Sequence, residues 1–401
     1  MIPCMHPGHT PEVRSEAAPL LRPFMPELDT LRGIAVLGVM CLHAFFWQYA
    51  SYSFGRWGRV ILNITRPGWV GVNLFFVLSG FLITGILLDS RSRPDYYRRF
   101  YTRRALRILP AYYLLLLCLL VLKSSSAAFV GLSFIYLSNV TNFFGVTCDY
   151  GPLWSLAVEE HFYILWPAVV HKITTRTLVW ISGGIALGIP LARALSFSLG
   201  WKNGLDWYTW FAADGLAAGS LLAILLRTPV SRVQIRNLAA SLLGTTFLLA
   251  IAGQPFGITG RTRLLGAAFQ WTLLNLFFAG ILLLFLLLGT GPHKRYVNLR
   301  PLRFLGYISY GLYLDHLLAF RMYDRICRHY APQWIPSNGH FGLVLLRFAV
   351  AGSGAIAVAY LSRGFFEERF LRLKDSLVPR RAETPTDRAF AEVTGADGRV
   401  A

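Results

Sequence analysis

Long runs of apolar residues alternate with short polar segments along the whole chain, and this pattern predicts a bundle of membrane-spanning helices. About 20 apolar residues in an α-helix cross the hydrocarbon part of a bilayer. We therefore expect an all-α integral membrane protein with about ten transmembrane helices. Their approximate ranges are 31–51, 68–88, 108–123, 154–171, 177–195, 207–226, 237–253, 265–289, 304–320 and 341–362.

The polar segments divide the chain into three predicted parts. Residues 1–27 contain prolines and charges of both signs without an apolar run, so they do not read as a signal peptide and predict a polar cytoplasmic segment. Residues 28–372 form one transmembrane domain. Residues 373–401, rich in Arg, Glu, Asp, Thr and Pro, predict a flexible cytoplasmic tail. We expect no second soluble domain, so the membrane domain and its loops carry the chemistry.

Composition and charge support this interpretation. The 401 residues are 55% hydrophobic and 14% aromatic, and 39 Lys and Arg against 20 Asp and Glu give a net charge of +19. With the N-terminus in the cytoplasm, most of these cations lie in cytoplasmic segments, as the positive-inside rule requires. The charge therefore indicates a multi-pass protein of the cell (inner) membrane, with both termini cytoplasmic and the lipid bilayer as partner. It does not indicate a nucleic-acid partner.

The five cysteines show no spacing typical of a metal or redox site, so we expect no metal. Cys148 and Cys327 both fall in predicted external loops, and the sequence leaves open whether they form a disulfide. It is silent on the oligomeric state.

His43 is the main candidate catalytic residue, because an ionisable group inside an apolar helix is costly and therefore indicates function. Arg32 lies eleven residues earlier. Eleven steps of about 100° make roughly three turns, which puts both side chains on one stripe about 16 Å apart. Taken alone, the histidine has about even odds of a structural hydrogen bond, and the arginine is more often a cation that reaches the lipid headgroups.

Two further motifs hold polar residues within the second predicted span and at the start of the third. Ser79 and Gly80 lie inside the second span, where a helix break would expose backbone donors for an oxyanion, while ordinary small-residue packing is at least as common. Arg104 and Arg107 are three residues apart on one helix face and suit a phosphate. Taken alone, such a pair more often marks topology or contacts lipid headgroups.

Two more motifs come from later spans. Glu159 and Glu160 begin the fourth span, and because adjacent residues point about 100° apart, we expect one of them to face the interior and act on His43. Their alternative role is to complement the helix dipole. Tyr310 and His316 belong to a polar stripe at helical spacing in the ninth span.

Arg193 in the fifth span and Asp214 in the sixth are two further charged residues inside the apolar runs. We interpret both as candidates for structural pairing.

Together and in this order, the motifs resemble the integral-membrane acyltransferase-3 family, which O-acylates surface polysaccharides and other exported glycans. The resembling stretches are 27–43, 68–83, 98–110, 153–167 and 304–316. The resemblance implies a ten-helix bundle that takes an acyl group, commonly acetyl, from cytoplasmic acyl-coenzyme A and passes it to an acceptor hydroxyl across the membrane.

The resemblance also assigns roles to the motif residues. It makes Arg32 and His43 functional, and it matches Arg104 and Arg107 to a paired-arginine motif and Glu159 and Glu160 to an acidic pair. Ser79, Tyr310 and His316 match further recurring positions. Two departures concern the acceptor side: His161 stands where relatives usually carry glutamine, and Asp315 where an apolar or aromatic residue is expected.

These residues predict one mechanism. Arg32, Arg104 and Arg107 hold the phosphates of the donor, Glu159 or Glu160 supports His43, and His43 deprotonates the acceptor hydroxyl or passes the acyl group on. The acceptor is a glycan or glycolipid, such as lipopolysaccharide O-antigen or exopolysaccharide. Alternatives are a transporter or exporter with charges along its path, which would often show duplicated halves that this sequence lacks, and a non-catalytic factor in polysaccharide export.

Overall fold

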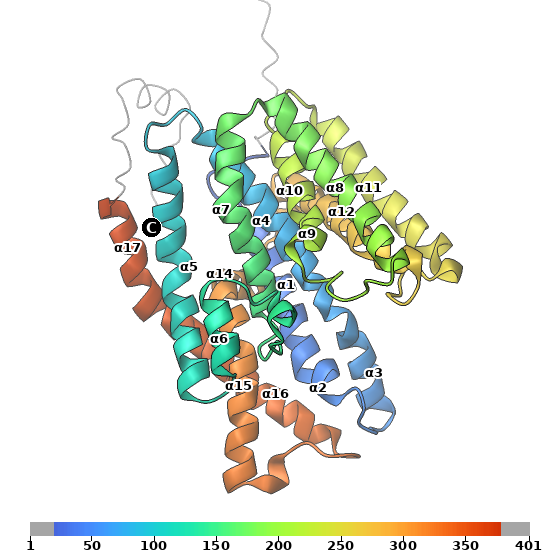
Figure 1. Ribbon diagram of the computed structural model, residues 1–401, viewed down its shortest axis with the longest axis vertical. Coiled ribbons are helices and arrows are strands. Elements are labelled where there is room, and N and C mark those ends of the chain that lie inside the picture. The colour runs from blue at the N-terminus through green and yellow to red at the C-terminus, as the bar shows by residue number, and fades with distance from the viewer. Residues whose placement is uncertain (1–19, 378–401) are drawn as a thin grey trace, which may run out of the picture.

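The computed structural model describes residues 20–377, and within these residues every regular element is a helix (Figure 1). Most of the predicted N-terminal segment, residues 1–19, and the predicted tail from residue 378 onward lie outside the described residues. The helices form one bundle, with α8, α11 and α12 on one side and α5, α15 and α17 on the other.

The helices are more numerous than the predicted spans, because short helices lie within or between several of the predicted ranges. The α-helices are α1 (Pro26–Cys41), α2 (Trp47–Tyr49), α3 (Arg56–Thr65), α4 (Val70–Asp89), α5 (Tyr96–Val121), α6 (Ala127–Phe134), α7 (Leu153–Lys172), α8 (Thr175–Ser198), α9 (Thr209–Ala212), α10 (Asp214–Leu225), α11 (Arg232–Ala252), α12 (Leu264–Gly289), α13 (Lys294–Val297), α14 (Arg300–Tyr307), α15 (Ser309–Tyr330), α16 (Phe341–Leu361) and α17 (Glu368–Leu377).

Seven helical segments among the described residues are long and apolar enough to cross a membrane. They are Pro26–Tyr49, Arg56–Asp89, Tyr96–Val121, Thr175–Ser198, Arg232–Ala252, Leu264–Gly289 and Phe341–Leu373. The other three predicted spans correspond to α7, α10 and α15. The helix α10 has only 12 residues, while α7 and α15 carry charged and histidine side chains along their lengths. An all-helical, multi-pass membrane protein is thus confirmed, but neither the count of ten nor the side of the termini is.

Glycines allow two pairs of helices to cross closely. A Cβ added at Gly33 of α1 would lie 1.9 Å from the carbonyl oxygen of Leu302 in α14. One added at Gly80 of α4 would lie 2.0 Å from the carbonyl oxygen of Leu216 in α10. The backbones therefore touch at these crossings, which is the small-residue packing typical of membrane helices.

The crossing of α4 with α10 also decides between the two interpretations of Ser79 and Gly80. The helix α4 runs without interruption from Val70 to Asp89, so its backbone N–H groups at Ser79 and Gly80 are used within the helix. The predicted helix break with free oxyanion donors is wrong at this position. The glycine is there because α10 leaves no room for a side chain.

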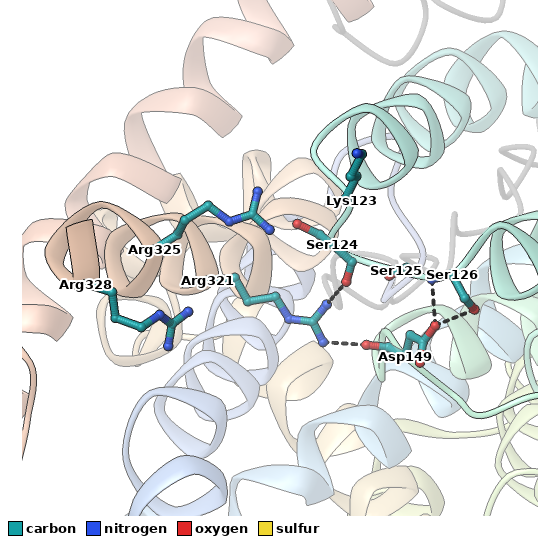
Figure 2. Close-up of a pocket in the computed structure, with 8 residues that line it drawn as sticks. All are labelled: Lys123, Ser124, Ser125, Ser126, Asp149, Arg321, Arg325 and Arg328. Atoms are coloured by element: carbon teal, nitrogen blue, oxygen red, sulfur yellow. Dashed lines mark hydrogen bonds between the residues drawn. The ribbon is translucent and has the colours of Figure 1, made fainter.

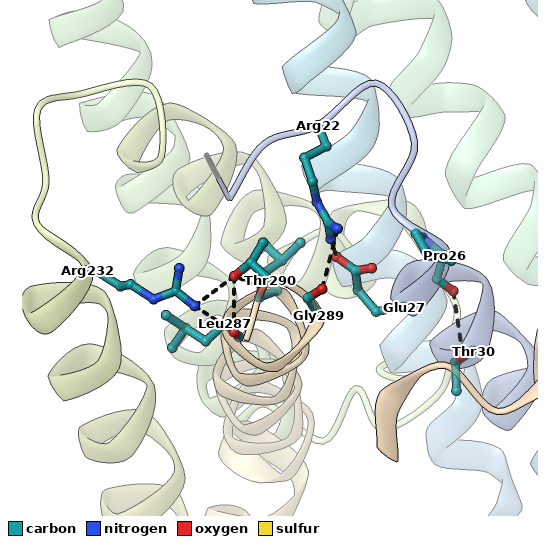
Figure 3. A network of polar contacts seen from close by, with 9 residues as sticks. Arg22, Pro26, Glu27, Thr30, Arg232, Leu287, Gly289 and Thr290 are labelled. Atoms are coloured by element: carbon teal, nitrogen blue, oxygen red, sulfur yellow. Dashed lines mark hydrogen bonds and ion pairs between the residues drawn. The ribbon is translucent and has the colours of Figure 1, made fainter. Parts of the chain in front are cut away.

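Arginines from two directions hold the C-terminal end of α12 (Figure 3). The guanidinium of Arg232 donates to the carbonyl oxygen of Leu287 at 2.9 Å and to Oγ1 of Thr290 at 2.7 Å. On the other side, Arg22 donates to the carbonyl oxygen of Gly289 at 3.4 Å and pairs with the buried carboxylate of Glu27. Both cations complement the negative end of the helix dipole, and Arg22 ties the start of α1 to α12.

Arg193 and Asp214, each a candidate for structural pairing in the sequence, form a buried ion pair with each other. Their side chains are each 1% exposed, and the guanidinium lies 2.7 Å from Oδ2 of Asp214. Arg193 also donates to the carbonyl oxygens of Phe211 and Ala268, and Thr272 donates to Asp214 at 2.7 Å. The pair joins α8, α10 and α12.

The four cysteines among the described residues do not cross-link the fold. Cys148 is an exposed free thiol and Cys327 is a buried free thiol, so the disulfide that the sequence left open between them is not formed.

Candidate active site

His43 lies in a short π-helical turn that interrupts the first long helical segment. The turn spans Leu42–Phe46, directly after α1 and before α2. Such turns insert one extra residue into a helix and are frequent at functional sites. The sequence pattern did not predict it, because the apolar periodicity of this segment is unchanged.

The imidazole of His43 is held by a second histidine, His316 of α15. Nδ1 of His43 lies 3.0 Å from Nε2 of His316, and Nδ1 of His316 lies 2.9 Å from the carbonyl oxygen of Leu312. A carbonyl only accepts, so we assign the proton of His316 to Nδ1, which leaves its Nε2 as acceptor. The proton of His43 is then on Nδ1, and the lone pair of its Nε2 is available to another molecule.

Seven of the nine predicted site residues line one narrow cavity of about 100 Å³ between α1, α4, α5, α7 and α15. Apolar and aromatic side chains close it on several sides, and His43 and His316 lie beside it rather than in its wall. The predicted residues in the wall are Arg32, Ser79, Arg104, Arg107, Glu159, Glu160 and Tyr310. Segments far apart in the sequence therefore meet where the motifs predicted a common site.

Both adjacent glutamates line the cavity, whereas the sequence predicted that one would face the interior. The hydroxyl of Tyr163, one turn later on α7, donates to Oε2 of Glu159 at 2.9 Å and also contacts Ser79 at 3.2 Å. The orienting partner of His43 is His316 and not a carboxylate. The predicted support of His43 by a glutamate is therefore replaced by the histidine pair.

The arginines lie at the end of the cavity formed by α5. The guanidinium of Arg104 lies 5.1 Å from the ring centre of Tyr163 and 5.9 Å from that of Phe100. Arg107, one turn further, forms no ion pair within residues 20–377. Arg32 is bonded to Asp29 at 2.9 Å, three residues earlier on its own helix. Two guanidinium groups in the cavity wall are thus without a carboxylate partner, as a bound anion would require.

Tyr313 connects the cavity to the histidine pair. It lines the cavity, its hydroxyl lies 2.6 Å from Oγ of Ser155, and its ring centre lies 6.1 Å from that of His316. Sequence reasoning did not select Tyr163, Ser155 or Tyr313 as site residues. The signal was present, because Tyr163 is four residues after Glu159 and Tyr313 is three residues before His316 on the same helix faces.

The two departures from the family pattern lie beside the cavity rather than in it. Nδ1 of His161 lies 2.7 Å from Oγ1 of Thr209, which also accepts from Asn139. His161 therefore joins α7 to α9 and the segment before it. Asp315 is partly buried, and its Oδ1 has no hydrogen-bond partner in the described part of the chain.

Comparisons with known proteins identify sequences that are similar to most of the chain. A family model described as an acyltransferase domain matches residues 25–363. The peptidoglycan O-acetyltransferase OatA of Listeria monocytogenes is 28% identical over 74% of this chain and 49% of its own length. The putative peptidoglycan O-acetyltransferase YrhL of Bacillus subtilis is 29% identical over 73% of the chain and 48% of its own length.

The O-acetyltransferase OatA of Staphylococcus aureus is 25% identical over 73% of the chain and 50% of its own length. The chain thus spans about half the length of the curated relatives that it matches. No solved structure matches it.

Proposed function

Because the chain belongs to the acyltransferase-3 family, whose domain extends over residues 25–363, we propose that it is a membrane O-acetyltransferase. It transfers an acyl group, commonly acetyl, from cytoplasmic acyl-coenzyme A to a hydroxyl of a glycan at the cell surface. The relatives named above as O-acetyltransferases support the reaction. The cell membrane is its place of action, with the arginine-rich end of α5 toward the cytoplasm.

One observation carries this proposal: the hydrogen bonds of His43 leave its Nε2 as a free base. His316 accepts from Nδ1 of His43 and is itself fixed by the carbonyl oxygen of Leu312. An orienting group that fixes the tautomer of a catalytic imidazole has the same role in the triads of acyl-transfer enzymes. Here, the orienting group is a neutral imidazole in place of a carboxylate.

The arginines of the cavity are suited to the donor. Coenzyme A carries several phosphate groups, and guanidinium groups bind phosphate through paired charge-assisted hydrogen bonds. In this proposal Arg104 and Arg107 hold these phosphates at the cytoplasmic end, with Arg32 beside them. The narrow cavity then directs the thioester toward His43.

The chemical step transfers one acyl group and moves one proton. Nε2 of His43 takes the proton of the acceptor hydroxyl while its oxygen attacks the thioester carbonyl. The tetrahedral intermediate collapses with cleavage of the carbon–sulfur bond, and the imidazolium returns the proton to the leaving thiolate. The products are an O-acyl glycan and free coenzyme A. Tyr313 and Tyr163 place hydroxyl groups in the cavity wall, and we assign them to positioning of the reacting groups.

We propose peptidoglycan as the first acceptor to test, because two of the relatives are named for it. Lipopolysaccharide O-antigen and exopolysaccharide are the other two acceptors. The test uses the full chain in lipid vesicles with labelled acetyl-coenzyme A on one side, and it measures label in each glycan on the other. Transfer to one glycan by the native protein, lost in His43→Ala, supports the proposal. Equal transfer by a folded His43→Ala protein contradicts it.

A further inference from the structure

A second polar cleft lies at the end of α5 opposite its arginine-rich half (Figure 2). It is about 610 Å³ in volume and lies between the turn that follows α5 and the last three turns of α15. In the orientation proposed above, this cleft opens on the outer side of the membrane. None of the motifs that define the active site contributes to it.

Four cations line the cleft: Lys123, Arg321, Arg325 and Arg328. The three arginines are four and three residues apart, so they lie on one face of α15. No ion pair joins any of the four to a carboxylate in the part of the chain that the structure describes. Their charge is therefore available to an anion.

The single acidic residue of the cleft does not neutralise these cations. Oδ2 of Asp149 accepts from the backbone N–H of Ser126 at 2.8 Å and from its hydroxyl at 2.6 Å. These bonds hold the carboxylate at the N-terminal end of α6, for which Ser126 is the N-cap residue. Figure 2 shows this carboxylate directed toward Ser126, away from Arg325 and Arg328.

The wall also offers hydroxyl donors without partners. Oγ of Ser124 and Oγ of Ser125 are buried and form no hydrogen bond with the described residues. Buried hydroxyl groups are almost always hydrogen-bonded in folded proteins. Two unpaired hydroxyls next to four cations are typical of a site that awaits an oxyanion or a sugar.

Arg321 connects the cleft to the histidine pair. Its guanidinium donates to the carbonyl oxygen of Ser124 at 2.7 Å and to that of Asp149, so its position is fixed. It lies 5.2 Å from the ring centre of Tyr150, whose hydroxyl donates to the carbonyl oxygen of Leu314. Arg321 is five residues after His316 on α15, about 7.5 Å along the helix.

We propose that this cleft binds the acidic group of the acceptor, so that the acceptor is a glycan carrying a carboxylate or phosphate. The inference rests on the proposed O-acetyltransferase function and adds the chemical class of its acceptor. An acid bound by Arg325 and Arg328 places the neighbouring sugar along α15 toward His43. The cations thus select charged glycans over neutral ones and orient a hydroxyl for acylation.

The test compares two disaccharides of the peptidoglycan type, one with its free lactyl carboxylate and one with that carboxylate converted to a neutral amide. Binding of each is measured to the full chain in nanodiscs of phosphatidylcholine, without donor. We expect the native protein to bind the charged disaccharide about tenfold more tightly, as loss of a charge-assisted contact predicts. In the double variant Arg325→Gln, Arg328→Gln, we expect this preference to disappear.

The matched control is Arg59→Gln, an exposed arginine at the start of α3 that lies outside the cleft. It should keep the preference. Equal binding of both disaccharides by the native protein overturns the proposal, as does a preference that survives the double variant. If disaccharide binding appears only in nanodiscs that also contain phosphatidylglycerol, a lipid headgroup takes part as ligand. This result also overturns the proposal. The binding test contains no acetyl donor, so its result does not depend on acetyl transfer. A failure of acetyl transfer would therefore contradict the proposed function alone.

Discussion

The bundle contains two groups of charged residues that differ in whether their charges are paired. Around Arg193 and Asp214, each charge lies against its opposite, and Thr272 and two backbone carbonyls add hydrogen bonds. Around Arg104 and Arg107, the guanidinium groups face a cavity. Arginines occur in both groups, so the difference shows that an unpaired charge next to a cavity, and not a charge among apolar helices alone, indicates chemistry.

The largest effect should follow His43→Ala, because this change removes the proposed catalytic base beside the cavity that Arg104 and Arg107 line. We expect acetyl transfer to fall by about a hundredfold to ten-thousandfold, the usual contribution of general acid–base catalysis. The assay is transfer of labelled acetyl to the glycan acceptor, with protein level and unfolding temperature measured in parallel. Gln48→Ala, an exposed change on the adjacent α2, is the control and should retain activity.

Substitution of Arg193 should instead lower the free energy of unfolding. Arg193→Leu leaves the carboxylate of Asp214 buried without its partner, and breaking a buried pair costs about 3–5 kcal/mol. Thermal unfolding of the purified protein should register this loss. The double variant Arg193→Leu, Asp214→Leu removes both charges and should recover much of the stability. A single variant that unfolds like the native protein would contradict the distinction between the two groups.

Arg107→Gln should affect donor binding more than the chemical step. Loss of a charge-assisted contact with a phosphate predicts a rise in the KM for acetyl-coenzyme A of about tenfold to a hundredfold, with a smaller change in kcat. Steady-state kinetics at several donor concentrations separates the two constants. Arg98→Gln lies on the same helix outside the cavity and is the matched control. Equal effects of both changes would indicate a general effect of positive charge on this face.

The smallest effect should come from His316, which acts on the reaction through His43. His316→Ala removes the acceptor that fixes the tautomer of His43, and the loss of one orienting hydrogen bond predicts a fall in kcat of about tenfold with KM unchanged. His316→Gln keeps an acceptor oxygen and should restore part of kcat. A rise in KM without a change in kcat would argue against the orienting role.

Much of this organisation was visible in the sequence, and the limits have physical causes. Arg193 and Asp214 were identified as candidates for pairing because charges in apolar helices need partners, and the motif residues were selected for chemistry at helical spacing. The pairing of His43 with His316 was not predicted, since the two are 273 positions apart and nothing in the local pattern joins them. The sequence instead suggested a glutamate as partner.

The packing of the helices also settles alternatives that the sequence pattern left open. The sequence at Ser79 and Gly80 allowed either a helix break or a close helix crossing. The structure has the close crossing, because the backbone of Leu216 in α10 lies against Gly80. The count of ten spans is not confirmed at α7, α10 and α15, because α10 has only 12 residues and the other two carry charged and histidine side chains. The cleft at the end of α15 was missed because its wall combines this helix with residues 123–126 and Asp149, which are far from it in the sequence.

The π-helical turn at Leu42–Phe46 makes the length of this segment as important as its composition. The turn accommodates one residue more than a regular helix of the same rise. Removing Ala44 would let the segment close as a continuous α-helix. The helices on either side would keep their positions, but the side chains within the turn, His43 among them, would change direction. A shortened protein could keep every side chain of the site and still misalign its catalytic base. Alignments of relatives across this turn should therefore be judged by their gaps as well as by their identities.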